Sequence, residues 1–252
     1  MRGGGKVETQ KVVEIGAERK ASAPGKSLQP EVIQNLPGLP VLPETLVKLE
    51  LAAAERPASL ARVSDLILSD PGAAIQVMRH ADRDWGGGGH PQRIEDAISS
   101  LEVQACLEAI SKHTITRRRR DLPIAAAWEH AGVIAYASGL EAERTNHCVP
   151  EDARWVGLCH DLGKFPEILG WELAGRHHAD VNFVGLSIAE AWSLPRCVVE
   201  YFSDLLNFRS NRPWTILVDQ AHRMVRKQPS ACAGHQSYDR LDYDFPERKL
   251  TV

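Results

Sequence analysis

The sequence predicts an all-helical protein, and two features of its pattern carry that prediction. Between Leu36 and Lys227, apolar residues recur mostly at the 3.6-residue spacing of helices, and Pro, Gly or Asn separates the successive segments. The alternation of apolar and polar residues that is typical of strands is scarce, and no internal repeat has a fixed period. With 43% hydrophobic and 25% charged residues, the composition is typical of a soluble globular protein.

Prolines and capping residues mark the first elements. The Pro-rich segment 36–44 is expected to be extended and pinned against the body, and a helix is expected to start near Glu44. The hydroxyl of Ser59 can cap a second helix, which continues to about residue 68. Asp70 directly precedes Pro71, and this pair predicts an N-cap followed by proline at the first helical position. The second and third helices are therefore expected to form a hairpin.

Two unusual segments interrupt the helices in the middle of the chain. The glycines at 86–89 predict a flexible connector, because they lack the Lys-Ser/Thr and the preceding strand of a phosphate loop. Helical spacing runs through 94–101 and again from about 103 to 113, and it stops before Arg117–Arg120. That basic run could clamp phosphates or an acidic partner, but a solvated helix end is the favoured interpretation. Further helices are expected near 124–142, 150–164, 183–192, 196–207 and 213–227.

The two ends of the chain differ from its body in composition. Residues 1–27 are expected to form a flexible N-terminal arm, and residues 228–252 a polar C-terminal tail. The beginning of the chain lacks the apolar region of a signal peptide, and no apolar run is long enough to span a membrane. The five cysteines contain no CxxC pair and are interpreted as reduced thiols. A cytoplasmic location is therefore expected.

Charge is unevenly distributed along the sequence. The number of Lys and Arg residues minus the number of Asp and Glu residues is +3 for residues 1–27, −7 for 28–225 and +1 for 226–252. A protein that binds nucleic acid usually presents a basic face to neutralise phosphates. Because the body of the chain is acidic, nucleic acid is an unfavoured partner. The basic arm and Arg117–Arg120 nevertheless leave nucleic-acid binding as a third hypothesis. This hypothesis predicts that binding depends steeply on salt.

Two histidines and an aspartate are the main candidates for chemistry. His130 shares a helical face with apolar residues, and His160 does the same on a later helix, so both are expected to point inward and to converge. With the adjacent Asp161 they form a nitrogen and oxygen ligand set that suits Mn, Fe, Ni, Zn or Mg. Asp219 is a weaker candidate for a fourth ligand, and Lys164 could contact a phosphate. The alternative is that the histidines are hydrogen-bonded core residues, with Asp161 fixing the tautomer of His160.

Motifs spread over residues 36–227 resemble those of the HDOD branch of the HD superfamily. The opening Leu-Pro-Gly-Leu-Pro at residue 36 resembles the first motif of that family. The other similar segments are Ile67–Met78 around its Asp-Pro turn, Arg79–Asp82, Ile94–Leu101, Trp128–His130, His160–Lys164 with its His-Asp pair, and Gly185–Pro195. This resemblance implies a two-lobed helical domain of a bacterial regulatory protein, with an N-terminal helical lobe at 28–122 packed on an HD-like lobe at 123–227.

The resemblance also implies a degenerate site. Members of the family generally show no established catalysis and are thought to act in signal transduction. Val181 stands where many relatives carry a histidine, and Leu205–Leu206 stands where a His-His pair is common, so a binuclear centre would lack ligands. His177 and His178 lie near the first of these positions but out of register, and they are interpreted as a solvated turn.

The sequence therefore favours a non-catalytic signalling module over an enzyme. In this hypothesis a groove between the two lobes receives an unidentified signalling protein or a small ligand such as a nucleotide, and no membrane is involved. His130, His160 and Asp161 are then mainly structural, with a divalent metal as an optional addition. The alternative is a mononuclear metal-dependent phosphohydrolase acting on a nucleotide or another phosphoester, with His130, His160, Asp161 and Asp219 as ligands.

Overall fold

The computed structural model describes residues 36–85, 89–115, 122–171, 180–207 and 213–227. Within these residues the chain is helical, as predicted, and the β structure is limited to an isolated parallel bridge between Val41 and Thr114. None of the described helices is both long and apolar enough to cross a membrane. The predicted arm and tail, most of the glycine run, Arg117–Arg120 and His177–His178 lie outside the described residues.

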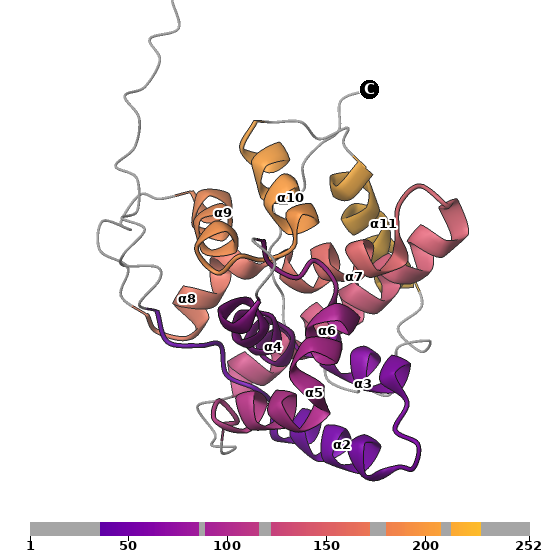
Figure 1. Ribbon diagram of the computed structural model, residues 1–252. Coiled ribbons are helices and arrows are strands. Elements are labelled where there is room, and N and C mark those ends of the chain that lie inside the picture. Colours follow the sequence, from indigo (N-terminus) through magenta and orange to yellow (C-terminus); the bar gives the residue numbers. More distant parts are fainter. Residues whose placement is uncertain (1–35, 86–88, 116–121, 172–179, 208–212, 228–252) are drawn as a thin grey trace, which may run out of the picture.

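The N-terminal lobe consists of α2 (Pro43–Ala54), α3 (Leu60–Ile67), α4 (Pro71–Asp84) and α5 (Ile94–Ser111), which pack together as shown in Figure 1. The predicted caps are confirmed. The Ser59 side chain accepts a hydrogen bond from the Arg62 amide at 3.3 Å, and Asp70 accepts one from the Ala73 amide at 3.0 Å. Each cap satisfies an amide that the first turn of a helix leaves without a partner.

The helix α5 is broken in its middle. Glu102 has a φ of 64°, which lies in the left-handed region, so regular helix stops and restarts at this residue. The break falls between the two periodic runs that the sequence shows at 94–101 and 103–113. Both pieces bury an apolar face, with Ile98 in the first and Ile110 in the second.

The second lobe is built around the long helix α6 (Leu122–Thr145). Two helices pack on α6, namely α7 (Pro150–Cys159) and α11 (Pro213–Lys227) (Figure 1). Gly157 lets α7 approach α6 closely, because a Cβ at this position would lie 2.8 Å from the Ile134 carbonyl oxygen. The remaining elements are the 3₁₀ helix η2 (Leu162–Lys164), α8 (Phe165–Ile168), α9 (Val181–Ala191) and α10 (Arg196–Leu206).

The helix expected near 150–164 ends earlier than predicted. It stops at Cys159, and His160 and Asp161 follow as a turn before η2. The φ of Gly163, within η2, is not positive, so this glycine is not required by a left-handed backbone conformation. A Cβ on Gly163 would lie 1.9 Å from the Val181 carbonyl oxygen, so glycine is needed where the start of α9 approaches η2.

The extended segment before α2 joins the two lobes. Trp128 of α6 donates its indole N–H to the Pro40 carbonyl oxygen at 2.8 Å. A Cβ on Gly72, at the start of α4, would lie 1.9 Å from the same oxygen, so the segment also touches the backbone of the N-terminal lobe. Val41 donates its amide to the His113 carbonyl oxygen at 2.9 Å, beyond the end of α5. The prediction that this segment is pinned against the body is confirmed.

A large hydrophobic core continues from one lobe into the other. Its members come from helices of both lobes, and they include the fully buried Trp128, Trp155, Phe165 and Phe202. The Trp128 and Phe165 ring centres are 4.5 Å apart beneath the extended segment. The two-lobed helical architecture is therefore the observed one, while the domain boundaries at 27, 122 and 227 stay predictions.

Candidate functional site

Three histidines from different helices meet in the second lobe. His130 lies on α6, His160 follows the last residue of α7, and His222 lies on α11. One ring nitrogen from each lies within 4.8 Å of the other two. The ring centres are 5.2 Å apart for His130 and His160, 5.2 Å for His130 and His222, and 4.9 Å for His160 and His222. We call these residues the histidine cluster, and His130 and His160 converge in it as expected.

The end of α7 fixes the tautomer of His160. Nδ1 lies 2.7 Å from the Gly157 carbonyl oxygen, and because a carbonyl oxygen only accepts, Nδ1 must carry the hydrogen and donate it. The lone pair is therefore on Nε2, which is buried without a hydrogen bond in the described part of the chain. A histidine that donates through one nitrogen and presents the other is oriented as metal-binding histidines usually are.

Burial keeps the other two imidazoles neutral. Desolvation, with a smaller contribution from the nearby His160, lowers the pKa of His130 to about 4. Desolvation likewise lowers the pKa of His222 to about 3, with His160 and His130 adding to the effect. At neutral pH each of these rings therefore has one nitrogen that carries no hydrogen.

Asp161 lies at the edge of the histidine cluster and is paired with a lysine. Its Oδ2 is 3.5 Å from Nε2 of His160, and its Oδ1 is 2.8 Å from Nζ of Lys164. Burial raises the pKa of the Asp161 carboxyl, but the neighbouring His160 and the ion pair with Lys164 outweigh burial and lower the pKa to about 2. The carboxyl is therefore ionised, and the lysine expected to contact phosphate is bound to it.

The structure places His222, and not Asp219, beside His130 and His160. Asp219 is exposed on α11 and is not among the described residues whose potential ligand atoms come together. Ile216, which precedes Asp219 by nearly one helical turn, is also 43% exposed, so this side of α11 faces solvent. The buried face carries Val218, and His222 follows it by one helical turn. The helical spacing from Val218 to His222 was the signal that sequence reasoning missed.

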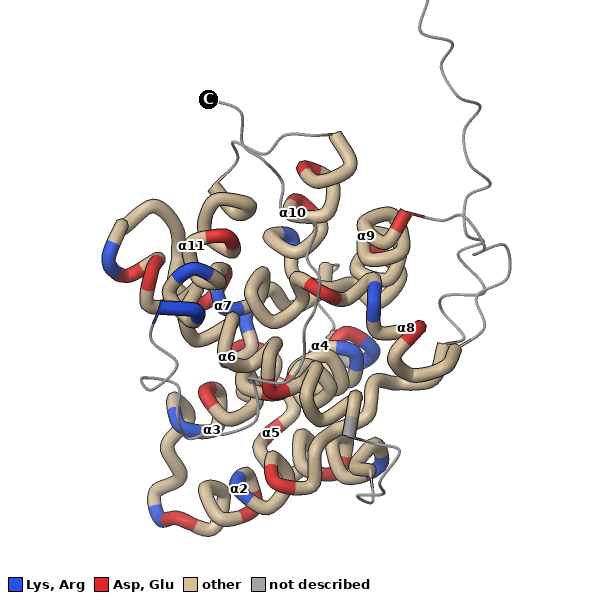
Figure 2. Tube along the Cα trace, turned by 180° about the vertical axis from the view of Figure 1, so that it is seen from behind, with Lys and Arg blue, Asp and Glu red and all other residues tan. Residues whose placement is uncertain are grey.

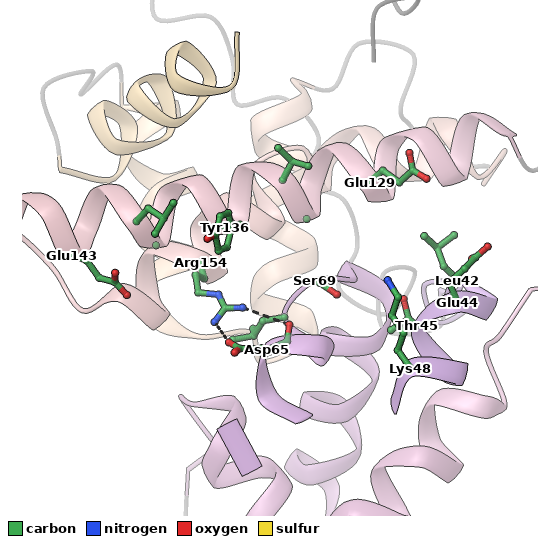
Figure 3. Close-up of a pocket in the computed structure, with 15 residues that line it drawn as sticks. Leu42, Glu44, Thr45, Lys48, Asp65, Ser69, Glu129, Tyr136, Glu143 and Arg154 are labelled. Atoms are coloured by element: carbon green, nitrogen blue, oxygen red, sulfur yellow. Dashed lines mark hydrogen bonds and ion pairs between the residues drawn. The ribbon is translucent and has the colours of Figure 1, made fainter. Parts of the chain in front are cut away.

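A groove of about 670 Å³ lies between the two lobes, and Figure 3 shows its lining. We call it the interlobe groove. The segment 42–48, Asp65 and the end of α3 form one wall, and α6 with Arg154 of α7 forms the other. Arg154 and Asp65 make an ion pair between the two walls. A Cβ on Gly132 of α6 would lie 2.5 Å from the Ser69 carbonyl oxygen, so the lobes touch through their backbones at this point.

Comparison with known families identifies the chain. The model of the HDOD domain matches residues 39–170, which is more than half of the sequence. The chain belongs to the HDOD domain family. The matched part of this HDOD protein contains His130, His160 and the lining of the interlobe groove, whereas His222 lies beyond it.

Solved structures with the same fold include the MmoQ response regulator of Methylococcus capsulatus. One MmoQ crystal structure is 18% identical to this HDOD protein, with a TM-score of 0.59 over 78% of this chain and 89% of the MmoQ chain. A second, of MmoQ residues 20–298, is 17% identical, with a TM-score of 0.54 over 78% and 91% of the two chains. At such identities the likeness shows a shared fold. A search of curated proteins found no match.

The donor atoms of the histidine cluster fit a divalent metal ion. Three imidazoles bound to one ion at about 2.1 Å, at near-tetrahedral angles, have ring centres about 5 Å apart, and the cluster has separations of 4.9–5.2 Å. Neutral imidazole nitrogens suit Zn, Ni or Fe, whereas Mg prefers oxygen ligands. The donor set therefore differs from the expected combination of two histidines and two carboxylates.

Proposed function

We propose that this HDOD protein is a non-catalytic bacterial signal-transduction module that acts in the cytoplasm by binding a protein partner in the interlobe groove. The observation that carries the proposal is that both lobes line the groove. A partner seated there contacts both lobes at once, so its affinity depends on how the lobes are placed relative to each other. That MmoQ, which shares the fold, is a response regulator supports a signalling role.

The surroundings of the histidine cluster support the absence of catalysis. Asp161 is paired with Lys164, and the exposed Asp219 is not part of the cluster. A phosphohydrolase needs a group that holds the phosphate and a carboxylate that stabilises the metal or activates water. In this protein the lysine and the carboxylate that would do so neutralise each other.

Genetic complementation tests the proposed function. A strain lacking the gene is complemented with the wild type, with Leu140→Asp in the groove, or with the His160→Ala/Asp161→Ala double variant, and transcripts are profiled. We expect Leu140→Asp to fail to restore the wild-type profile and the double variant to restore it. The reverse pattern, with both proteins present at equal levels, would show that the histidine cluster and not the groove carries the function.

The second candidate function is a mononuclear metal-dependent phosphohydrolase for a nucleotide or another phosphoester, and the geometry of the histidine cluster favours it. His130, His160 and His222 would hold the ion, and Lys164 would have to leave Asp161 to contact the phosphate. When bound, a divalent ion polarises a phosphoryl oxygen and lowers the pKa of a bound water.

Elemental analysis of the purified, untagged protein separates the two candidates. One equivalent of Zn, Ni or Fe, lost in the His160→Ala/Asp161→Ala double variant, together with turnover on a phosphoester panel, would establish the enzyme. Metal without turnover is the result expected if the ion only holds α6, α7 and α11 together. Protein without metal, even after incubation with each ion, means that the cluster is a packed core feature.

A further inference from the structure

The α4 helix carries basic side chains along one of its faces. Arg79 and His80 precede Arg83 by four and three residues, a spacing that places side chains on the same side of a helix. Nε of Arg83 donates to the Arg79 carbonyl oxygen at 3.3 Å, and Nη2 of Arg83 lies 3.4 Å from Nδ1 of His80. These contacts hold Arg83 against the preceding turn of α4.

The end of α5 brings two more basic side chains to this face. Lys112 and His113 follow the last residue of α5. A Cβ on Gly38 would lie 2.1 Å from Nε2 of Gln76 and 2.7 Å from Cε1 of His113, so both side chains meet at this glycine. Because Gln76 precedes His80 by one turn of α4, the His113 ring lies beside the basic face of α4.

The charges of these side chains act on one another. Burial is the largest cause that lowers the pKa of His113, and the cations Arg79, Arg83 and Lys112 add to it. Burial also lowers the pKa of Arg79, with a smaller contribution from Arg83. Figure 2 shows basic positions on α4 from the side opposite to that of Figure 1. We call this group the basic cluster, and its members are Arg79, His80, Arg83, Lys112 and His113.

Arg79 is partly buried without an acidic partner. Its guanidinium carbon lies 4.6 Å from the centre of the ring of Trp192, which follows α9. Among the described side chains, no acid forms an ion pair with the cations of the cluster, and this includes Asp82 of the same helix. Cations that proteins bury are usually paired with an acid. The basic cluster therefore has an excess of positive charge.

The ends of the two helices explain only part of this arrangement. Carbonyl groups at a helix C-terminus favour cations, which accounts for Arg83 in the last turn of α4 and for Lys112 after α5. The effect is confined to the last turn, and Arg79 lies before that turn. Because the guanidinium of Arg79 is already packed on Trp192, it loses less conformational freedom when it binds an anion.

We propose that the basic cluster binds the phosphoryl group of a small ligand. A phosphoryl group carries about two negative charges at neutral pH and accepts hydrogen bonds through three oxygens. Arg79 and Arg83 on α4 and Lys112 after α5 offer it donors from two helices. A carboxylate has one charge and two oxygens, so it would leave part of this positive charge without a partner.

The surroundings of the basic cluster favour a small ligand over a protein. The core of a protein interface is usually apolar. The large apolar side chains that the described chain exposes include none from α4 or α5. The cluster also lies outside the lining of the interlobe groove, so this proposal does not depend on the proposed function.

NMR of the histidine rings, with inorganic phosphate as the probe, tests the proposal. The full-length protein with ¹³C-labelled histidine is titrated with sodium phosphate at fixed neutral pH and fixed ionic strength, and sodium acetate is the comparison. The signals of His113 are assigned with His113→Gln. We expect them to shift and to saturate with phosphate, and acetate to bind at least about tenfold more weakly. A shift that does not saturate, or equal affinity for acetate, overturns the proposal.

A matched pair of double variants separates the basic cluster from total charge. Arg83→Gln/Lys112→Gln removes two exposed cations of the cluster, and Arg223→Gln/Lys227→Gln removes two exposed cations of α11. The first should weaken phosphate binding by roughly tenfold, as expected for the loss of two exposed charge pairs. The second should stay within about twofold of the wild type, because distant exposed charges are screened. Equal weakening by both overturns the proposal.

A phosphoserine peptide with three alanines on each side tests whether the ligand is small. If the cluster contacts only the phosphoryl group, this peptide should bind within about threefold of inorganic phosphate. Binding that is more than about tenfold tighter would mean that the peptide backbone adds contacts. The cluster would then belong to a phosphorylated segment of a protein, and the assignment to a small ligand would be wrong.

Discussion

Asp70 and the histidine cluster both bury polar side chains, but they satisfy them in different ways. The Asp70 carboxylate accepts hydrogen bonds from the Leu42 amide at 2.9 Å, the Thr45 hydroxyl at 2.8 Å and the Ala73 amide at 3.0 Å. Each donor belongs to the same lobe or to the segment that joins the lobes. The histidine cluster instead brings one ring nitrogen from each of three histidines within 4.8 Å of the others, and burial keeps His130 and His222 neutral.

The difference separates a polar site that is complete by itself from a group of side chains whose ring nitrogens fit a metal ion. A buried carboxylate with three donors is complete without any external group. A group of neutral imidazoles that lower one another's pKa can instead hold a divalent cation through its ring nitrogens. Asp70 therefore contributes to folding, whereas a metal ion bound at the cluster would link folding to ligand binding.

The largest effect is expected from Asp70→Ala. The substitution removes the cap of α4 and leaves buried amides of Leu42 and Ala73 without acceptors. Loss of a cap and of buried hydrogen bonds should lower the free energy of unfolding by about 4 kcal/mol. Urea denaturation measures the free energy of unfolding, and Asp180→Ala is the control because Asp180 caps α9 in an exposed position. Loss of the Asp180 cap should lower the free energy of unfolding by about 1 kcal/mol or less. Equal losses in the two variants would show that burial adds nothing to the cap.

The next effect is a pH dependence that comes from Asp70. Burial raises its pKa from 3.8 to about 6, more than the hydrogen bonds from Leu42, Ala73 and Thr45 lower it. The folded protein thus holds this proton more tightly than the unfolded chain does. The resulting stabilisation is fully present below pH 3.8 and is lost as the pH rises through about 6.

Asp70→Asn isolates this contribution, because an amide does not titrate. Between pH 3 and pH 7, the free energy of unfolding of the wild type should fall by about 3 kcal/mol relative to that of the variant. Urea titrations of both proteins at several pH values measure the difference. A difference that stays constant with pH, or grows in the opposite direction, would contradict the raised pKa.

A smaller stabilisation is expected when a metal ion binds the histidine cluster. Zn or Ni at a hundred times its dissociation constant should stabilise the protein by about 2.7 kcal/mol, which raises the melting temperature by about 5–10 °C. Differential scanning fluorimetry with and without a chelator measures the shift. His222→Leu should abolish it, and Asp219→Ala should leave it unchanged because Asp219 is exposed outside the cluster. Loss of the shift in Asp219→Ala alone would restore Asp219 as the ligand.

The sequence predicts local features of this molecule better than it predicts the site. Ser59 and Asp70 reveal their helix starts because a cap depends only on residues within one turn. The sequence does not show which face of α11 is buried, because both Asp219 and His222 lie on faces with helical spacing. Only the packing of α11 on α6 decides which of them is buried.

The interlobe groove is the feature of the molecule that the sequence predicts least well. A groove between lobes was expected from the family resemblance, but Glu129 and Glu143 look in the sequence like ordinary solvated positions of a long helix. Their role in the groove depends on how the N-terminal lobe lies against α6, and contacts far apart in sequence, such as Asp65 with Arg154, set that placement.

The smallest change in stability is expected from breaking the hydrogen bond between Trp128 of α6 and Pro40 of the extended segment. Trp128→Phe keeps an aromatic ring in the core but leaves the Pro40 carbonyl oxygen without the indole donor. Trp155→Phe is the matched control, because Trp155 is equally buried and its indole nitrogen makes no hydrogen bond in the described residues. Both variants lose similar ring volume, so the difference between them reports the hydrogen bond, and Trp128→Phe should be less stable by about 1 kcal/mol. If the two variants unfold at the same urea concentration, the lobes are held together by apolar packing alone, and the polar contacts of the joining segment set only its position.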